Sequence, residues 1–397
     1  MRIALIADTF PPLRTSGAVQ LRDLSREFVR QGHNLTVLLP SSTIQNPWQI
    51  EDFDGARVIR LKAPQTKDIG YIRRTIAEFM LPFAMLKSLR KSPVANESWD
   101  GIVWYSPSIF FGPLVDALKH KSKCKGYLII RDIFPEWAVD MGLMGRGIPY
   151  KVFRAVANQQ YSVANIIGVQ TPGNLKYFEE WSKAPGRKVE VLPNWLDKPA
   201  TKKCSIRIDQ TPISGRTVFV YAGNMGIAQG MDIVLELAKR FKQRDDVGFL
   251  FVGRGSEVPK LKSLAQQNGL TNVVFFDEID PDEIPDLYSQ CSIGIVALDP
   301  RHKSHNIPGK FLTYMQSGLP VLANVNAGND LAHIIRHENV GQVCESNDIE
   351  ELYQKSLTLI EQIKADRELS ERCQKLFFRE FFVESTVKQI VASLMNQ

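Results

Sequence analysis

The sequence predicts an α/β protein with two doubly wound, Rossmann-like domains that face each other across a cleft. The first reason is that short apolar runs rich in β-branched residues alternate with amphipathic stretches of helical length, as in parallel sheets covered by helices. The second is that the same pattern starts again in the second half of the chain. The third is size, because 397 residues with 44% hydrophobic content exceed the ~250–300 residues at which one core stops growing.

The apolar runs give the expected strands in chain order. They are residues 2–8, 35–40, 101–106, 126–132, 166–171 and 189–193 in the first half, and 217–223, 247–253, 272–277, 293–298 and 320–325 in the second. Residues 196–216 lack periodicity and have the composition of a linker or a loose surface stretch. We therefore expect one domain over residues 1–193 and a second over 194–379, with a last helix, 380–397, packing back on the first.

The overall composition excludes several classes of protein. A net charge of +6 is too diffuse for a dedicated nucleic-acid binder, but it suits phosphorylated substrates or an anionic membrane surface. The five cysteines are scattered and form no CxxC pair, so we expect a reduced, cytoplasmic chain without a disulfide framework or a zinc site. The N-terminal run reads as a strand and not as a signal peptide, and the central apolar run 79–86 is shorter than a membrane span.

The stretch "SHNIPGKFLTYMQSGLP" predicts a short helix with Lys310 in its first turn. Ser304 or Asn306 can cap this helix, Pro308 suits its first turn and Gly318 can end it. Free backbone N–H groups at a helix start, together with a lysine, make a site for an anion such as phosphate. The alternative is an ordinary capped helix with a solvated lysine.

Two further loops of the second half have the composition of phosphate-binding turns. "YAGNMGIAQG" places Gly223, Asn224 and Gly226 between a strand and a helix, and "VGRGSE" places Gly253 and Arg254 after the next strand. A flexible glycine backbone can wrap a diphosphate, and a guanidinium binds phosphate in a bidentate manner. Three successive strand-to-helix loops therefore point to one diphosphate site in the second domain.

The first half offers a small-residue helix start and an acidic loop. Gly17, between Ser16 and Ala18, opens a helix after the first strand, but the GxGxxG fingerprint is absent, which disfavours a nicotinamide enzyme. "RDIFPEW" places Asp132 and Glu136 after another strand, where a carboxylate can orient or deprotonate an acceptor hydroxyl. A plain turn, capped by Asp132, is the alternative.

Patterns that could hold a metal are weak. "DPD" at 280–282 resembles a metal-binding DxD, but Pro281 and the residues after it favour an N-cap. His302 and His305 have no third ligand nearby, so contact with phosphate or sugar is favoured over zinc. We expect no metal ion and no other cofactor.

Residues 71–91 combine an apolar middle with basic ends, as does a helix that lies in a membrane interface. A buried core helix interrupted by Pro82 is the alternative. The basic residues are Arg73, Arg74, Lys87, Arg90 and Lys91.

The combination of motifs resembles the GT-B fold glycosyltransferases of family 4 over essentially the whole chain. The motifs are "FPP", "SGAVQLRDLSREFVRQGH", "VLPNWLD", "YAGNMGIAQG", "FVGRGSE", "NVVFFDEI" and "PGKFLTYMQSGLPVLA". Two of them, "DTFPPLRTSGAVQLRDLSREF" and "RDIFPEW", are similar to bacterial O-antigen and capsule transferases, particularly N-acetyl-L-fucosamine transferases. The resemblance implies a GT-B fold, an acceptor-binding first domain and a donor-binding second domain.

The resemblance also implies roles for individual residues. Asp132 would lie beside the reacting sugar, and Lys310 and Arg254 would stabilise the leaving diphosphate. The donor would contact Gly17, Gly223, Asn224, Gly226, Gly253, Phe276, His305, Pro308, Gly309 and Thr313, with Phe275 and Asp277 beside the base. The sequence departs from the family where the E-x7-E glutamates become His305 and Thr313, and where an Arg and a Lys become Asn224 and Gln229.

The expected function is therefore metal-independent hexosyl transfer. A UDP-sugar would donate an acetamido-deoxyhexosyl group, such as N-acetyl-L-fucosamine, with retention at the anomeric carbon. The acceptor would be an undecaprenyl-diphosphate-linked saccharide of O-antigen or capsule biosynthesis, at the cytoplasmic face of an anionic inner membrane. A nucleotide-sugar epimerase or phosphorylase of the same fold, and a non-catalytic sugar-nucleotide-binding subunit, are the alternatives.

Overall fold

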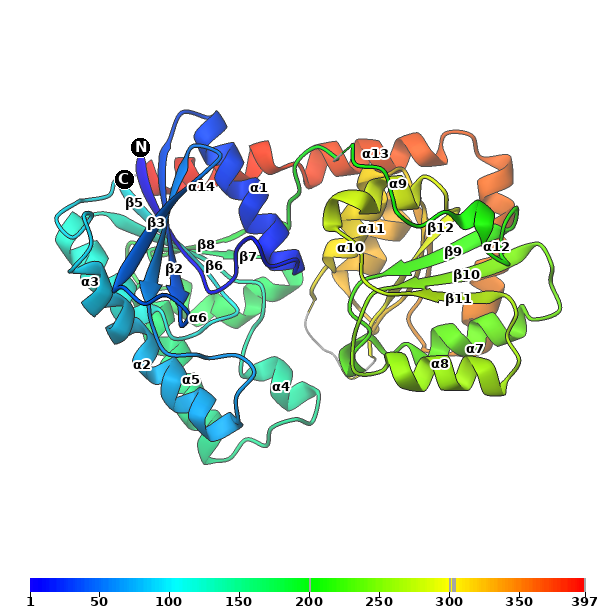
Figure 1. Cartoon of the computed structure of the whole chain (residues 1–397), viewed down its shortest axis with the longest axis horizontal. Coiled ribbons are helices and arrows are strands. Elements are labelled where there is room, and N and C mark those ends of the chain that lie inside the picture. The colour runs from blue at the N-terminus through cyan, green and yellow to red at the C-terminus, as the bar shows by residue number, and fades with distance from the viewer. Residues whose placement is uncertain (200, 300, 302–304, 396–397) are drawn as a thin grey trace. The chain divides into compact units, whose positions relative to one another are not determined.

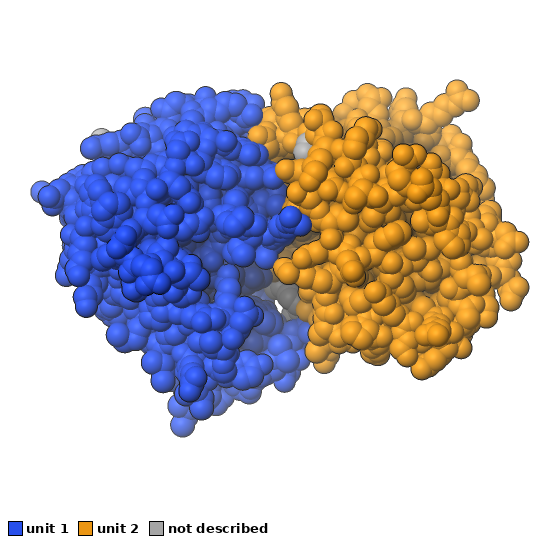
Figure 2. Space-filling view, in the orientation of Figure 1, with its two compact units in different colours: residues 1–195, 383–397 blue, residues 196–382 orange. Residues whose placement is uncertain are grey.

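The computed structural model describes residues 1–199, 201–299, 301 and 305–395. The chain forms two compact units, shown in different colours in Figure 2. One unit comprises Met1–Trp195 and Val383–Gln397, and the other comprises Leu196–Phe382. The division after Trp195 lies slightly later than the sequence suggested, and the second crossing follows Phe382.

The first unit is built on an eight-stranded sheet with the order β3-β4-β2-β1-β5-β6-β7-β8 (Figure 1). Its strands are β1 (Arg2–Ile6), β2 (Asn34–Ser41), β3 (Trp48–Phe53), β4 (Ala56–Lys62), β5 (Gly101–Tyr105), β6 (Lys125–Ile129), β7 (Ile166–Val169) and β8 (Lys188–Val191). All neighbouring strands pair in parallel except β3, which pairs antiparallel with β4. The β3–β4 hairpin was missing from the expected strands.

Helices cover both faces of this sheet. They are α1 (Ser16–Arg30), α2 (Tyr71–Leu89), α3 (Gly112–Ser122), α4 (Glu136–Asp140), α5 (Ile148–Ser162), α6 (Glu179–Ser182) and α14 (Val383–Met395), with a 3-10 helix at Pro172–Phe178. One core lies under α2, α3 and α5, and the other lies under α1 and α14. Ile390 and Leu394 of α14 are buried among the residues of this second core.

The second unit contains a parallel sheet with the order β11-β10-β9-β12-β13-β14. Its strands are β9 (Thr217–Ala222), β10 (Val247–Val252), β11 (Val273–Phe276), β12 (Ile293–Ala297), β13 (Val321–Asn324) and β14 (Gly341–Cys344). Its helices are α7 (Asp232–Arg240), α8 (Val258–Gln267), α9 (Ile284–Tyr288), α10 (Gly309–Gln316), α11 (Asp330–Glu338), α12 (Ile349–Ala365) and α13 (Leu369–Glu380), with 3-10 turns at Ile208–Gln210, Ile227–Gln229 and Pro281–Glu283. The predicted doubly wound α/β architecture is confirmed, although β14 was not expected.

The segment that follows the first crossing is not a loose linker, as residues 196–216 suggested. Cys204, Ile206, Ile208 and Ile213 are buried in the core of the second unit. The side chain of Gln290 also accepts a hydrogen bond from the backbone N–H of Ile208, at 3.0 Å. Cys204, Ile206 and Ile208 alternate with exposed polar residues, but this run of three apolar residues is too short to stand out as a strand in the sequence.

Candidate functional site

In the second unit, the strand order reverses between β9 and β12, where one connection runs toward β10 and the other toward β13. Ligands of doubly wound sheets bind outside the carboxyl ends of the strands at such a switch point. The loops that the sequence singled out follow β9, β10 and β12, so the structure brings them to this one edge. Their role in binding a ligand stays a prediction.

The loops after β9 and β10 are packed against each other through glycines. A Cβ atom on Gly253 would lie 2.0 Å from the carbonyl oxygen of Gly223, and one on Gly255 would lie 2.2 Å from that of Met225. Both glycines also have φ near +145°, a conformation that other residues rarely adopt. Glycine is therefore required at both positions for the two loops to approach.

The β9 loop is closed by the two residues that replace the family's Arg and Lys. The Gln229 side-chain oxygen accepts hydrogen bonds from the Gly226 N–H at 2.9 Å and from Asn224 Nδ2 at 3.1 Å. These neutral side chains satisfy each other and supply no positive charge. A diphosphate at this edge would have to find its cations elsewhere.

Lys310 lies in the first turn of α10. Its Nζ donates a hydrogen bond to the Tyr221 hydroxyl at 2.6 Å and lies 4.0 Å from the centre of that ring. Lys310 Cε would be 3.5 Å from a Cβ on Gly223, so the ammonium group is beside the β9 loop. The N-cap position is held by Pro308, and not by Asn306 as we expected, while Ser304 is outside the described residues.

Burial changes the charge of Lys310. The side chain is partly buried, and burial lowers the pKa of its ammonium group to about 7. No carboxylate pairs with it among the residues that the structure describes. A bound anion would stabilise the charged form, so this lysine is poised to respond to a phosphate.

Arg254, the other expected cation, is more exposed. Its guanidinium forms an ion pair with Glu278 at 3.1 Å, and its side chain is 63% exposed. The neighbouring strand end places Phe275 in a stack on Phe251, with ring centroids 5.0 Å apart, and leaves Asp277 exposed. Arg254 would have to exchange its carboxylate for a phosphate before it could bind the diphosphate.

His305 and Thr313, which replace the family's glutamates, have local partners. His305 Nδ1 lies 3.5 Å from the carboxylate of Asp330, and the Thr313 hydroxyl donates to the Gly309 carbonyl at 3.3 Å. Asp330 opens α11, after a cap by the Asn329 side chain. His305 thus lies beside the loop that follows β13.

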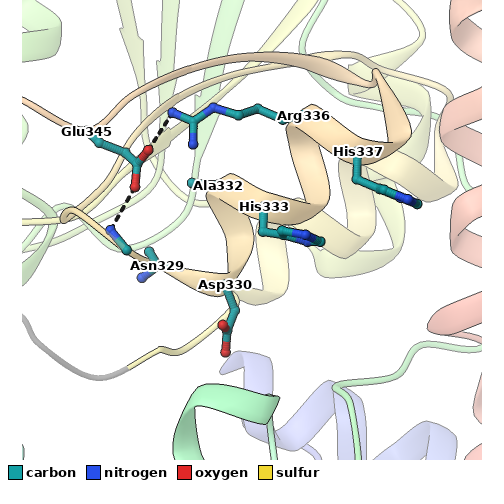
Figure 3. A pocket seen from close by; sticks show the side chains of 8 residues that line it. Asn329, Asp330, Ala332, His333, Arg336, His337 and Glu345 are labelled. Carbon is teal, nitrogen blue, oxygen red and sulfur yellow. Dashed lines mark hydrogen bonds and ion pairs between the residues drawn. The ribbon is translucent and has the colours of Figure 1, made fainter.

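A cavity of about 620 Å³ lies along this helix start (Figure 3). Figure 3 shows Glu345 between Arg336, its ion-pair partner, and the loop before α11, where it accepts a 2.8 Å hydrogen bond from the Gly328 N–H. His333 and His337 stack along the same helix, with ring centroids 5.7 Å apart. The cavity joins the carboxyl edge of β13 to the outer face of α11.

The corresponding switch point of the first unit lies between β1 and β5. Gly17 lies here, because a Cβ on it would be 3.3 Å from both the Thr9 methyl group and the Tyr105 hydroxyl. Burial raises the pKa of Tyr105, and Asp132 and Asp8 add to that rise, which places two carboxylates near its hydroxyl. The sequence singled out Gly17 and Asp132 but not Asp8 or Tyr105, and the roles of the first two stay predictions.

Asp132 lies next to a buried arginine. Arg131 stacks over Trp195, 4.7 Å from the ring centroid, and donates to the Leu192 carbonyl at 2.8 Å. Burial lowers the pKa of Arg131 to about 10, although Asp132 acts in the opposite direction. Glu136, the second expected acid, pairs with Arg154 and accepts from the Tyr150 hydroxyl, so it is engaged within the first unit.

The weak metal patterns have structural explanations. Asp280 caps a 3-10 turn by accepting from the Asp282 N–H at 3.0 Å, and it also pairs with Lys202 at 2.9 Å. His302 is outside the described residues. Over the described ranges, no three His, Cys, Asp or Glu side chains come together as a metal site would require.

Helix α2 spans most of the predicted interfacial segment and leaves one face uncovered. All five basic residues singled out in the sequence are exposed, although Arg74 pairs with Glu78. The exposed apolar side chains of α2 are Tyr71, Ile72, Ile76, Phe79, Met80 and Phe83. Among the described residues, no helix has the length and hydropathy that crossing a membrane requires.

In a comparison with known protein families, part of the second unit matches one family. Residues 216–362 match the family model described as "Glycosyl transferases group 1". The matched region starts at β9 and ends within α12, so it contains every loop of the β9–β12 switch point.

Two curated proteins are similar to the chain. "Putative colanic acid biosynthesis glycosyl transferase WcaI" of Escherichia coli (strain K12) is 26% identical over 277 residues, which cover 64% of this chain and 62% of that protein. "Probable glycosyltransferase WbjE" of Pseudomonas aeruginosa is 25% identical over 236 residues, 58% of each chain. The matches thus span about three fifths of the length of these relatives.

Solved structures share the fold at low identity. Sucrose-phosphate synthase from Thermosynechococcus elongatus superposes with a TM-score of 0.77 at 16% identity, covering 99% of this chain and 98% of that one. WaaG, a glycosyltransferase of lipopolysaccharide biosynthesis, gives 0.67 at 15% identity, and Anabaena HepE in complex with UDP and glucose gives 0.70 at 16%, each over 100% of both chains. The chain therefore has the GT-B fold of these transferases.

Proposed function

We propose that the protein is a metal-independent glycosyltransferase that uses a UDP-sugar donor. The acceptor is an undecaprenyl-diphosphate-linked saccharide of O-antigen or capsule biosynthesis, and the group transferred is an acetamido-deoxyhexose, with N-acetyl-L-fucosamine as the specific candidate. The family match over residues 216–362 and the names of the two curated relatives support transfer of a sugar in polysaccharide biosynthesis. Structural neighbours in complex with UDP or UDP-glucose support the donor.

The observation that carries the proposal is Lys310 beside the glycine loops of the β9–β12 switch point. In the transfer, the bond between the anomeric carbon and the diphosphate breaks while the acceptor oxygen bonds to that carbon, and the acceptor proton leaves with UDP. Negative charge then grows on the diphosphate. The Lys310 ammonium and the N–H groups of the α10 start would stabilise that charge, with Arg254 as a second cation once it leaves Glu278.

The exposed face of α2 supports a location at the membrane surface. Its apolar side chains are flanked by cations, which suits insertion among the headgroups of an anionic bilayer. The segment before and within α5 adds three exposed apolar side chains to the same unit: Leu143, Ile148 and Val152. We place the protein on the cytoplasmic face of the inner membrane, without a membrane-spanning helix among the described residues.

The donor site is tested by the thermal stabilisation that UDP, GDP and UDP-sugars give to the wild type and to Lys310→Ala. We expect UDP to stabilise the wild type and Lys310→Ala to weaken UDP binding by about tenfold or more, because a charge-assisted hydrogen bond is lost. Lys239→Ala removes an exposed lysine that pairs with Glu236 on α7, so it should bind UDP like the wild type. Equal stabilisation of the wild type and Lys310→Ala would remove Lys310 from the site.

A further inference from the structure

Asp8 is an acidic residue at the β1–β5 switch point, and its contacts within the fold do not explain why a carboxylate lies there. It lies two residues after the end of β1, and its Oδ1 is buried without a hydrogen-bond partner among the described residues. The residue as a whole is only partly buried, and the inference below requires that a ligand reach its carboxyl group. Burial raises the pKa of the Asp8 carboxyl, and Lys67, a backbone hydrogen bond at Asp8 and Arg74 offset that rise only in part.

Two cationic side chains, Lys67 and Arg74, come from segments outside the sheet and lie near the Asp8 carboxylate. Lys67 Nζ donates to the backbone carbonyl of Asp8 at 3.2 Å, and both Lys67 and Arg74 act to lower the pKa of the Asp8 carboxyl. Both cations are exposed, with Arg74 paired to Glu78 and Lys67 followed by Asp68. Arg74 is on α2, so the exposed apolar face of that helix starts beside the cluster.

The remaining neighbours close one side of the cluster. The hydroxyl groups of Thr9 and Thr15 form a hydrogen bond of 3.0 Å, and the Tyr105 hydroxyl donates a hydrogen bond to the Gln20 side-chain oxygen at 3.1 Å. Gly17 lies between them with no room for a Cβ at ordinary contact distance. The polar groups on this side of Asp8 therefore already bond to one another, and they leave the Asp8 carboxylate without a share in those bonds.

We propose that Asp8, Lys67 and Arg74 bind the phosphorylated acceptor, with Asp8 accepting a hydrogen bond from a sugar hydroxyl and the two cations holding the diphosphate next to that sugar. The apolar face of α2 then receives the lipid chain, so hydroxyl, diphosphate and lipid follow one another along the first unit. The inference rests on the proposed function and specifies its acceptor. It also assigns Arg74 to binding of the substrate, and not only to binding of the membrane.

The inference is tested by calorimetric binding, without any donor, of farnesyl-diphosphate-linked N-acetylglucosamine and of octyl N-acetylglucosaminide. We expect Lys67→Met and Arg74→Gln each to weaken binding of the diphosphate-linked probe by about tenfold, and to leave the octyl glycoside unchanged. Asp8→Asn should weaken both probes, because the anionic acceptor for the sugar hydroxyl is lost. Lys62→Met and Asp68→Asn are matched exposed controls in the same unit and should bind both probes within twofold of the wild type.

Three results would overturn the inference. They are failure of the wild type to bind the diphosphate-linked probe, binding by Asp8→Asn equal to wild type, and equal weakening of both probes by the Lys67 and Arg74 variants. Because the two cation variants leave Asp8 in place, they test the site even if Asp8→Asn folds poorly. Stabilisation by UDP tests the second unit separately, so failure of the proposed donor site and failure of this acceptor site are distinguishable.

Discussion

The side chain of Lys310 is partly buried, although its proposed function needs a positively charged ammonium group. Its lowered pKa means that near pH 7 the free protein holds this lysine in both protonation states. A bound diphosphate favours the ammonium form, so binding above pH 7 must take up a proton. Donor affinity is therefore linked to pH through a single side chain.

This linkage predicts that UDP affinity falls as pH rises from 7 to 9, by up to about tenfold per pH unit. The terminal phosphate of UDP, with a pKa of about 6, loses its last protons just above pH 7, which can only raise the affinity and so does not cause the fall. Calorimetric titration in buffers of different ionisation enthalpy measures both the affinity and the proton uptake. Lys310→Arg keeps its charge and should give a flat profile, and a flat wild-type profile would contradict the prediction.

The glycine pair of the β10 loop predicts a second residue-scale effect. Gly255→Ala introduces a Cβ that collides with the Met225 carbonyl at a φ of +148°, so we expect a loss of about 3 kcal/mol or more in the free energy of unfolding. Gly215 also has a positive φ but no atom within 4 Å of a Cβ, so Gly215→Ala should cost only about 1–2 kcal/mol. Urea denaturation measures both variants, and equal costs would show that the loop contact is unimportant.

At the scale of elements, α2 is an amphipathic helix whose polar and apolar exposed residues are mixed on one face. Pro82 is inside the helix and is buried. The inner face of α2 therefore agrees with the alternative interpretation of the sequence, a buried core helix that contains a proline. The outer face keeps three cations and six apolar or aromatic side chains in solvent, and Arg90 and Lys91 add two exposed cations just after the helix. Exposing such a face to water is unfavourable in free energy, whereas the same face is stabilised at a charged membrane interface.

The α2 face predicts flotation of the protein with vesicles that contain anionic lipid. Each cation near such a surface contributes about 1 kcal/mol, so neutralising all five to glutamine should reduce vesicle binding by more than about a hundredfold. A control neutralises five exposed lysines of the second unit: Lys239, Lys242, Lys260, Lys262 and Lys364. Equal flotation of the wild type and the α2 variant would exclude this face as the membrane contact.

At the scale of the whole molecule, regular patterns were predictable and long-range pairings were not. The buried parallel strands are continuous apolar runs, and this is why eleven of them could be read directly. The edge strand β3 mixes apolar residues with Gln49, Glu51 and Asp52, and β14 is interrupted by Gln342, so neither forms such a run.

The candidate site follows the same rule. The glycine loops and Lys310 stand out as local motifs, but the contact of Lys310 with Tyr221 joins residues 89 positions apart. Asp8 looks like any acid after a strand until the fold places it beside Tyr105. Only the three-dimensional arrangement shows that one of its carboxylate oxygens, Oδ1, is buried without a hydrogen-bond partner among the described residues.

The path of the chain gives the last prediction. Ile390 belongs to α14, far from the first unit in sequence, yet it is fully buried in the core under α1. Ile390→Ala should therefore destabilise the first unit by about 2–5 kcal/mol. Hydrogen exchange should speed up in β1, β5 and β6 while β9, β10 and β12 keep their protection. Ile360→Ala, at a matched buried position of α12 in the second unit, should give the reverse pattern, and faster exchange in β9 for Ile390→Ala would contradict the assignment of α14 to the first unit.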